Sequence, residues 1–94
     1  MGLVAQAVTY FSELTDQAER DLGVDHPDTL LCRDRLASAY KSAGDLGRAI
    51  PLLERTLKDR ERILAPDHPD TLTSRNNLAY VYQAAGDLGR AIPL

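Results

Sequence analysis

The chain has 94 residues and a mass of 10.3 kDa; 44% of its residues are hydrophobic, 27% are charged, and its formal net charge is −3. This balance fits one small folded domain and excludes an intrinsically disordered chain, which holds fewer apolar residues. The acidic balance gives no overall attraction to nucleic acid or anionic lipid. The single cysteine, Cys32, excludes an internal disulfide, and no apolar run reaches the roughly 20 residues of a membrane-spanning helix. We therefore expect a cytoplasmic protein with no nucleic-acid or membrane partner.

Apolar residues at helical spacing predict a first helix over residues 3–22. The tripeptide His26-Pro27-Asp28 then predicts the start of a second helix over residues 27–43. Proline fits the first turn because its missing N–H costs nothing there, and an acidic residue there favours the helix dipole. Gly44 is expected to end this helix, since glycine accepts the left-handed conformation that such ends need.

A third helix is predicted over residues 45–64, with Leu46, Ala49, Ile50, Leu53, Leu57 and Leu64 on its apolar face. Pro51 lies inside this helix, where its ring clashes with the carbonyl four residues back. That carbonyl belongs to Gly47, whose flexible backbone can absorb the distortion. We therefore expect a kink in the helix rather than a break.

The charged run over residues 54–62 is predicted to be a solvent-facing surface of the third helix. Glu54 with Lys58, and Arg55 with Asp59, have the four-residue spacing of helix-stabilising ion pairs. The interleaved acidic residues argue against a basic stripe for nucleic acid.

The rest of the chain repeats what precedes it at an offset of 42 residues. Residues 68–94 match residues 26–52 at 19 of 27 positions. A fourth helix is therefore predicted over residues 69–85, with a stub at 87–94, and no segment alternates as a strand. We expect one all-α repeat domain over residues 1–94, made of a partial repeat with a second helix only (1–25), a full repeat (26–67) and a partial repeat (68–94).

The repeated pattern of Leu36-Ala37, Tyr40, Gly44, Ala49 and Leu53, with its copy Leu78-Ala79, Tyr82, Gly86 and Ala91, resembles the tetratricopeptide repeat family. The usual unit of that family is about 34 residues. The longer unit here resembles the repeats of kinesin light chains and their bacterial relatives. The resemblance implies antiparallel helix pairs in a short right-handed α-solenoid that serves as a non-enzymatic protein–protein interaction scaffold. The chain departs from the pattern at Arg33 and Arg75, where shorter repeats often carry tryptophan.

Beside the apolar core stripe, another stripe runs along the first helix of each repeat, residues 27–43 and 69–85. It changes at every position between the repeats, while the core positions are nearly unchanged. It consists of Leu31, Asp34, Arg35, Ser38 and Lys41, and of their copies Thr73, Asn76, Asn77, Tyr80 and Gln83. Such divergence fits a binding face and equally fits unconstrained surface. The resemblance implies that these helices line a concave groove for an extended peptide. There the asparagines would pair with the peptide backbone, and Arg35 and Lys41 with acidic side chains.

The incomplete repeats at both ends favour a second possible function, self-assembly. The helix over residues 69–85 needs a second helix, and residues 3–22 of another chain have the pattern of one. Head-to-tail docking or swapping between chains would give a filament, a ring or a dimer.

Two short motifs match other families but fit their context poorly. His26-Pro27-Asp28 matches the tripeptide of J-domain co-chaperones, yet it recurs at the repeat period and follows an acidic helix. Gly44-Asp45-Leu46-Gly47 matches the GXXG loop of KH modules, yet no strand accompanies it and its aspartate would repel phosphate.

The residues able to bind metal or carry out catalysis form no recognisable set. His26, Cys32 and His68 lack the spacing of a zinc site, so we expect each histidine to cap or pack at its helix start. Cys32 and its copy Ser74 are expected to be half-buried. No nucleophile–base set or phosphate loop is present in the sequence. We expect no enzyme activity, no cofactor and no metal.

Overall fold

The computed structural model describes residues 2–86, which form four α-helices and no strand. The helices are α1 (Leu3–Leu22), α2 (Pro27–Ser42), α3 (Leu46–Ile63) and α4 (Pro69–Ala84). Each boundary lies within one residue of its predicted position. The all-α fold is therefore confirmed, while the stub predicted at 87–94 lies outside the described residues.

Helices α2 and α4, each the first helix of its repeat, begin and end in the same way. The Nδ1 atoms of His26 and His68 each accept a hydrogen bond from the backbone N–H two residues further along, both at 3.1 Å. This confirms the prediction that the histidines cap their helices. Gly44 and Gly86 follow the helix ends with φ angles of 77° and 79°, the left-handed conformation that glycine adopts without strain.

Helix α3 continues through Pro51, so the prediction that this proline does not break the helix is confirmed. Pro51 has no N–H to donate to the carbonyl of Gly47. Both residues are exposed, so water can satisfy that carbonyl. The bend expected at this point stays a prediction.

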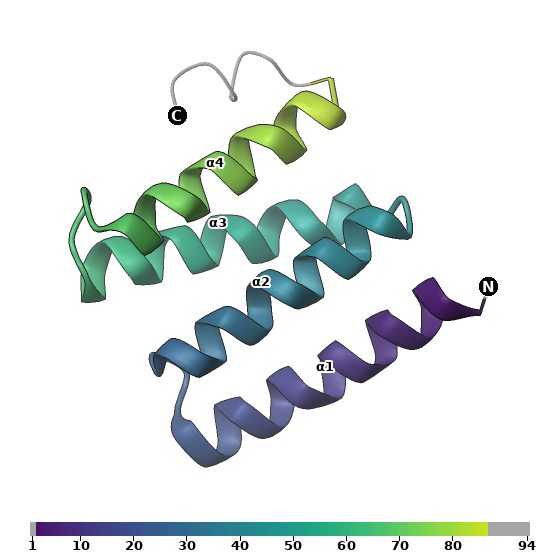
Figure 1. The fold of residues 1–94 in the computed structure, drawn as a ribbon, viewed down its shortest axis with the longest axis horizontal. Helices are drawn as coiled ribbons and strands as arrows, with labels where there is room; N and C mark the ends of the chain where they lie inside the picture. Colours follow the sequence, from purple (N-terminus) through teal and green to yellow (C-terminus); the bar gives the residue numbers. More distant parts are fainter. Residues whose placement is uncertain (1, 87–94) are drawn as a thin grey trace.

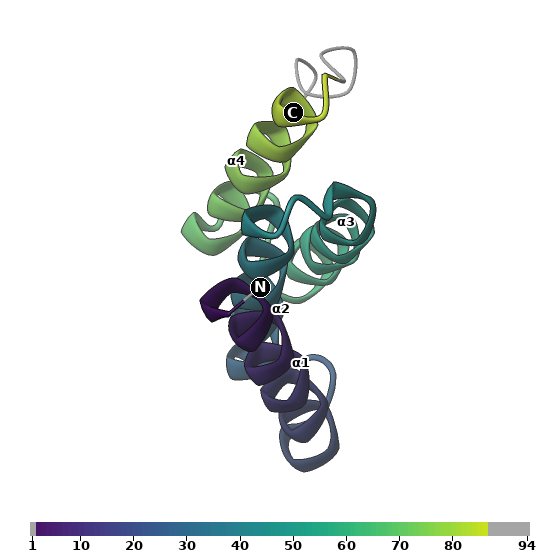
Figure 2. The same cartoon turned by 90° about the vertical axis from the view of Figure 1, so that its right-hand side faces the viewer.

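The helices pack in chain order, with α1 on α2, α2 on α3, and α3 on α4 (Figure 1). Figure 2 shows α2 and α4 in one row, with α3 to one side of it. The molecule measures 34 × 30 × 16 Å, and since a helix is about 10 Å across, its shortest dimension holds no more than two layers. The main core cluster joins α2, α3 and α4 through Ala37, Ala49, Leu53, Leu57, Leu78, Val81 and Tyr82.

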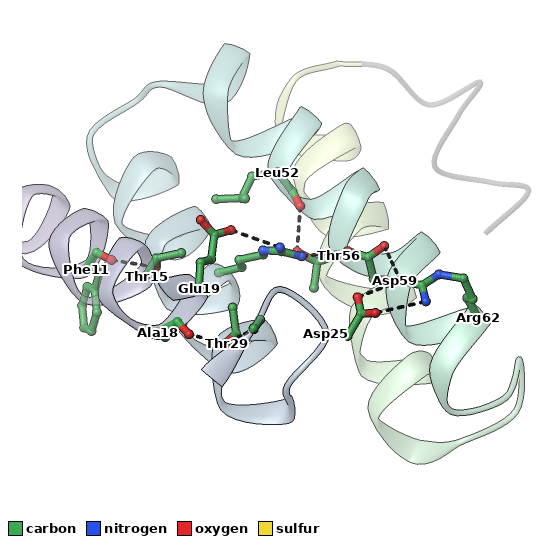
Figure 3. A network of polar contacts seen from close by, with 12 residues as sticks. Phe11, Thr15, Ala18, Glu19, Asp25, Thr29, Leu52, Thr56, Asp59 and Arg62 are labelled. Atoms are coloured by element: carbon green, nitrogen blue, oxygen red, sulfur yellow. Dashed lines mark hydrogen bonds and ion pairs between the residues drawn. The ribbon is translucent and has the colours of Figure 1, made fainter. Parts of the chain in front are cut away.

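Ion pairs link the first helices to their neighbours (Figure 3). The side chain of Arg33 is fully buried, and its Nη2 lies 3.1 Å from Glu19 Oε2 on α1. Its Nη1 lies 2.7 Å from Asp59 Oδ2 on α3, so one guanidinium joins three helices. The first of these pairs recurs one repeat later, where Arg75 Nη2 lies 2.8 Å from Glu61 Oε2.

The prediction that the charged run over residues 54–62 is a solvent-facing surface was wrong for Asp59 and Arg60, which belong to this network. Arg55, Lys58 and Arg62 are exposed as predicted. Arg60 is 6% exposed, and its Nη1 donates to Asp34 Oδ2 and to the Ser74 hydroxyl, both at 2.6 Å. Asp59 faces α2, as described above. These charges are buried because carboxylate and hydroxyl partners on neighbouring helices compensate them, which spacing along one helix does not reveal.

The prediction that Ser74 is half-buried was wrong. Cys32 is half-buried as expected, whereas Ser74 is only 1% exposed. Ser74 is buried because its hydroxyl accepts a hydrogen bond from the guanidinium of Arg60.

Arg62, near the end of α3, fixes the loop that precedes α2. Its Nη2 lies 2.8 Å from Asp25 Oδ1 and 3.3 Å from Asp59 Oδ1. The hydrogen bond from Arg62 lowers the pKa of the Asp25 carboxyl below its ordinary value. Because Arg62 and Asp25 are exposed, this pair positions the loop more than it stabilises the fold.

Candidate functional site

The predicted stripe borders two adjoining hollows. The central hollow, of about 340 Å³, is lined mainly by α2 and α4, with Leu53 of α3 contributing to its wall. The N-terminal hollow, of about 570 Å³, is lined by the first half of α1 together with α2 and α4. Asp34, Ser38 and Asn77 line both hollows, so together they form one groove, called the groove below.

All the predicted site residues except Gln83 line this groove. Asp34, Ser38, Lys41, Asn76, Asn77 and Tyr80 line the central hollow, and Leu31, Arg35 and Thr73 are added in the N-terminal hollow. Gln83 is exposed and lines neither hollow.

The apolar part of the groove was not predicted from the sequence. Ala37, Leu53 and Val81 line the central hollow, and Leu3, Val4, Ala7 and Phe11 line the N-terminal hollow. Of these residues, Leu53 was predicted to lie on the apolar face of the third helix.

The two hollows are copies of each other at the repeat offset of 42 residues. Leu53, Asn76, Asn77, Tyr80 and Val81 of the central hollow correspond to Phe11, Asp34, Arg35, Ser38 and Ala39 of the N-terminal hollow. The central hollow has a first helix on both sides, α2 and α4. The N-terminal hollow has the first helices α2 and α4 on one side and α1, a second helix, on the other.

Asp34 is part of the groove wall and is held in place by Arg60. Its Oδ2 accepts the hydrogen bond from Arg60, and its Oδ1 is buried without a hydrogen-bond partner among residues 2–86. Burial raises the pKa of the Asp34 carboxyl above its ordinary value of 3.8, and the charge of Arg60 offsets part of this rise. Asp34 therefore positions the wall of the groove.

Lys41 and Tyr80 meet across the central hollow. The Nζ atom of Lys41 lies 3.6 Å from the centroid of the Tyr80 ring, a cation–π contact worth roughly 0.5–1 kcal/mol at an exposed site. Tyr80 is 59% exposed and Lys41 is half-buried. The lysine expected to meet an acidic ligand is thus already in contact with an aromatic ring of the next repeat.

Arg35, Asn76 and Asn77 are among the exposed hydrogen-bonding side chains of the groove. Within residues 2–86, the guanidinium of Arg35 forms no ion pair. Each asparagine amide offers both donors and an acceptor, the two functions that a peptide backbone needs. The groove thus presents polar groups beside an apolar wall.

No second kind of site emerges in the described part of the chain. Between residues 2 and 86, no group of three or more His, Cys, Asp or Glu side chains is placed to hold a metal ion. In the same range, no helix is long and apolar enough to cross a membrane.

The sequence model of the tetratricopeptide repeat matches residues 1–62 and 36–94, which together span the chain. The chain belongs to the tetratricopeptide repeat family. Repeats of this family generally mediate protein–protein interaction. No curated protein matches the chain.

Solved structures agree with this assignment. A putative kinesin light chain from Podosopora anserina with nearly identical TPR-like repeats superposes with a TM-score of 0.92 at 32% identity, over 98% of this chain. Its Q17M variant gives a TM-score of 0.92 at 30% identity, also over 98% of this chain. The predicted likeness to kinesin light chain repeats is confirmed. This chain spans 44% and 43% of the lengths of those two structures.

Proposed function

We propose that this repeat domain is a non-enzymatic interaction scaffold that holds an extended peptide segment of a protein partner in the groove. The observation that carries the proposal is the composition of the groove. Exposed side chains of Arg35, Asn76 and Asn77 stand beside an apolar wall that includes Ala37 and Leu53.

Such a surface suits a peptide in extended conformation. A peptide backbone taken out of water must regain its hydrogen bonds, because an unpaired buried amide costs free energy. The amides of Asn76 and Asn77 supply both donors and acceptors for this purpose. Side chains of the peptide can then bury apolar surface against Ala37, Leu53 and Val81 of the central hollow.

Arg35 adds a preference for an acidic residue in the partner. Its guanidinium is exposed, and a charge-assisted bidentate hydrogen bond to a carboxylate is stronger than a neutral one. Lys41 contributes less than Arg35 in this proposal, because its ammonium already lies over Tyr80.

Selection from a library of random linear peptides against the full chain tests the proposal. Peptides that bind should lose affinity by about tenfold for Arg35→Ala and for Asn77→Ala, since one lost hydrogen bond to a ligand is worth about 1 kcal/mol or somewhat more. Arg55→Ala is the matched control, because Arg55 is an exposed arginine of α3 outside the groove. Unchanged affinity for both groove variants would reject this site.

A further inference from the structure

The acidic and basic residues of α3 lie on different sides of the helix. Its three acidic residues are half-buried and bind neighbouring helices, namely Glu54 with the Tyr82 hydroxyl, Asp59 with Arg33, and Glu61 with Arg75. Every exposed charged residue of α3 is a cation: Arg48, Arg55, Lys58 and Arg62. The folded helix therefore presents a basic surface, although its sequence alternates in sign.

Two of these cations border a hollow of about 400 Å³ between α2 and α3, called the outer hollow below. It is lined by Leu36 and Tyr40 of α2 and by Gly47, Arg48, Pro51, Leu52 and Arg55 of α3. None of these residues lines the groove. Arg48, Pro51, Leu52 and Arg55 have the spacing of one helix face. The outer hollow thus places apolar side chains between two guanidinium groups.

This side of α3 stays open in the middle of the repeat array. Helices α1, α2 and α4 all surround α3 in the described structure. The copies of the α3 residues on α1 are exposed as well, namely Ala5, Gln6, Thr9, Tyr10 and Glu13, which line a hollow of their own. Because α3 is the second helix that follows α1 and does not cover these copies, a following second helix leaves this side open.

The fold does not require cations at this surface. Arg55 and Lys58 of α3 correspond to Glu13 and Asp16 of α1 at the repeat offset of 42 residues. All four side chains are exposed. Two second helices of the same fold thus carry opposite charges at the same positions, so the positive charge on α3 serves something other than packing.

The positive charge is centred on Arg55 and Lys58. Within residues 2–86, neither forms an ion pair. The Nε atom of Arg48 lies 3.5 Å from Asp45 Oδ2, a loose and exposed contact. Arg62, one turn beyond Lys58, is already paired twice. The cations beside the outer hollow are therefore available to an acidic ligand.

An α-helix matches the spacing of the two arginines. Arg48 and Arg55 are seven residues apart, which is about 10.5 Å along the axis of α3. On a partner helix beside α3, two acidic residues seven positions apart have the same spacing and share one face. In an extended peptide, residues three positions apart span about 10 Å but point to opposite sides. The spacing therefore favours a helical ligand.

The surroundings of the outer hollow favour a protein over a nucleic acid as the ligand. An apolar side chain of a partner helix can bury surface against Tyr40 and Leu52, which a phosphate backbone cannot do. The chain has a net charge of −3, and α1 exposes Glu13, Asp16 and Asp21. These charges repel a long polyanion.

We propose that the outer hollow binds an acidic amphipathic helix of a partner protein. Two carboxylates of that helix bind Arg48 and Arg55 through charge-assisted hydrogen bonds, and an apolar side chain between them enters the hollow. The proposal does not depend on the peptide site in the groove, because the two surfaces share no residue.

Fluorescence anisotropy with a designed probe tests this proposal on the full chain. The probe is a stapled helical peptide with two glutamates seven residues apart and a leucine four positions after the first. Arg55→Glu should weaken its binding by at least about tenfold, because an attraction becomes a repulsion. Arg20→Glu is the matched control, since it makes the same charge change at an exposed arginine of α1 outside the groove and the outer hollow.

A second probe tests the geometry. It has the same composition, but its glutamates are five residues apart and so lie on different faces of its helix. It should bind at least about tenfold more weakly than the first probe, since only one glutamate can reach an arginine. Arg35→Ala, which changes the groove, should leave the binding of the first probe unchanged.

Four results would overturn the proposal. They are a first probe that does not bind, equal binding of the two probes, equal effects of Arg55→Glu and Arg20→Glu, and a single-stranded oligonucleotide that displaces the first probe from the chain. The last result would assign the cations to nucleic acid. Loss of the proposed peptide site would instead appear in the groove variants, so the two proposals are judged separately.

Discussion

The carboxylate of Asp34 and the guanidinium of Arg60, 2.6 Å apart, connect the packing of the repeats to the shape of the groove. Arg60 lies on α3 and also binds Ser74 on α4, so it ties both first helices to the helix between them. Asp34 lines both hollows of the groove. The width of the groove between α2 and α4 therefore depends on a buried polar contact as well as on apolar packing.

The raised pKa of Asp34 predicts the sign of a pH effect. Because the folded state binds the proton more readily than the unfolded state, the Asp34 contribution to stability falls as the pH rises from 3.8 through the raised pKa. It returns as the pH falls through the same range. In Asp34→Asn this contribution is absent, so the stability of the wild type relative to the variant should increase as the pH falls toward 4.

Urea unfolding of both proteins at a series of pH values measures this difference. A relative stability of the wild type that decreases on acidification would contradict the prediction. It would mean that the attraction of Arg60 for the ionised carboxylate outweighs the cost of burying it.

Arg33 and Arg75 offer a matched pair for measuring the ion-pair network. Arg33→Met should reduce the free energy of unfolding by about 3 kcal/mol, because it leaves Glu19 and Asp59 without their shared cation in a mostly buried place. Arg75→Met should cost no more than about 1 kcal/mol, because its one ion pair with Glu61 is partly exposed. Chemical denaturation followed by circular dichroism measures both losses. Equal losses in the two variants would show that the buried network is not what stabilises α2 between its neighbours.

The helices could be predicted because their ends are marked locally. Proline at the first turn, glycine after the last turn and the apolar periodicity each act within a few residues. The repeat offset of 42 residues then predicted the bounds of the fourth helix from those of the second. The caps at His26 and His68 could be expected on the same grounds, since a capping side chain bonds to the backbone only two residues away.

The roles of the charged residues on α3 could not be predicted in this way. Arg60 and Asp59 are paired with α2, at a distance of 26 residues along the sequence. The spacing within α3 suggested partners on the same helix instead. Which of the possible partners a charge takes depends on how the helices cross, and this is a property of the packing.

The groove was predicted in its polar part and missed in its apolar part. Divergence between repeats indicated Arg35, Asn76 and Asn77, because these positions differ while the core stays the same. Val4 and Phe11 are apolar residues of the first predicted helix, and the apolar periodicity gave no indication that they line a groove. They line the N-terminal hollow together with residues of α2 and α4.

Backbone amide chemical-shift mapping with a selected peptide locates the ligand on the folded chain and so tests whether the peptide binds in the groove. If a peptide binds in the groove, the largest shifts should cluster on the groove residues of α2 and α4, from Leu31 to Lys41 and from Thr73 to Tyr80. The amides near Arg55 on the outer side of α3 should change little. Shifts that cluster around Arg55, or along the outer face of α1 at Thr9 and Glu13, would contradict a ligand site in the groove.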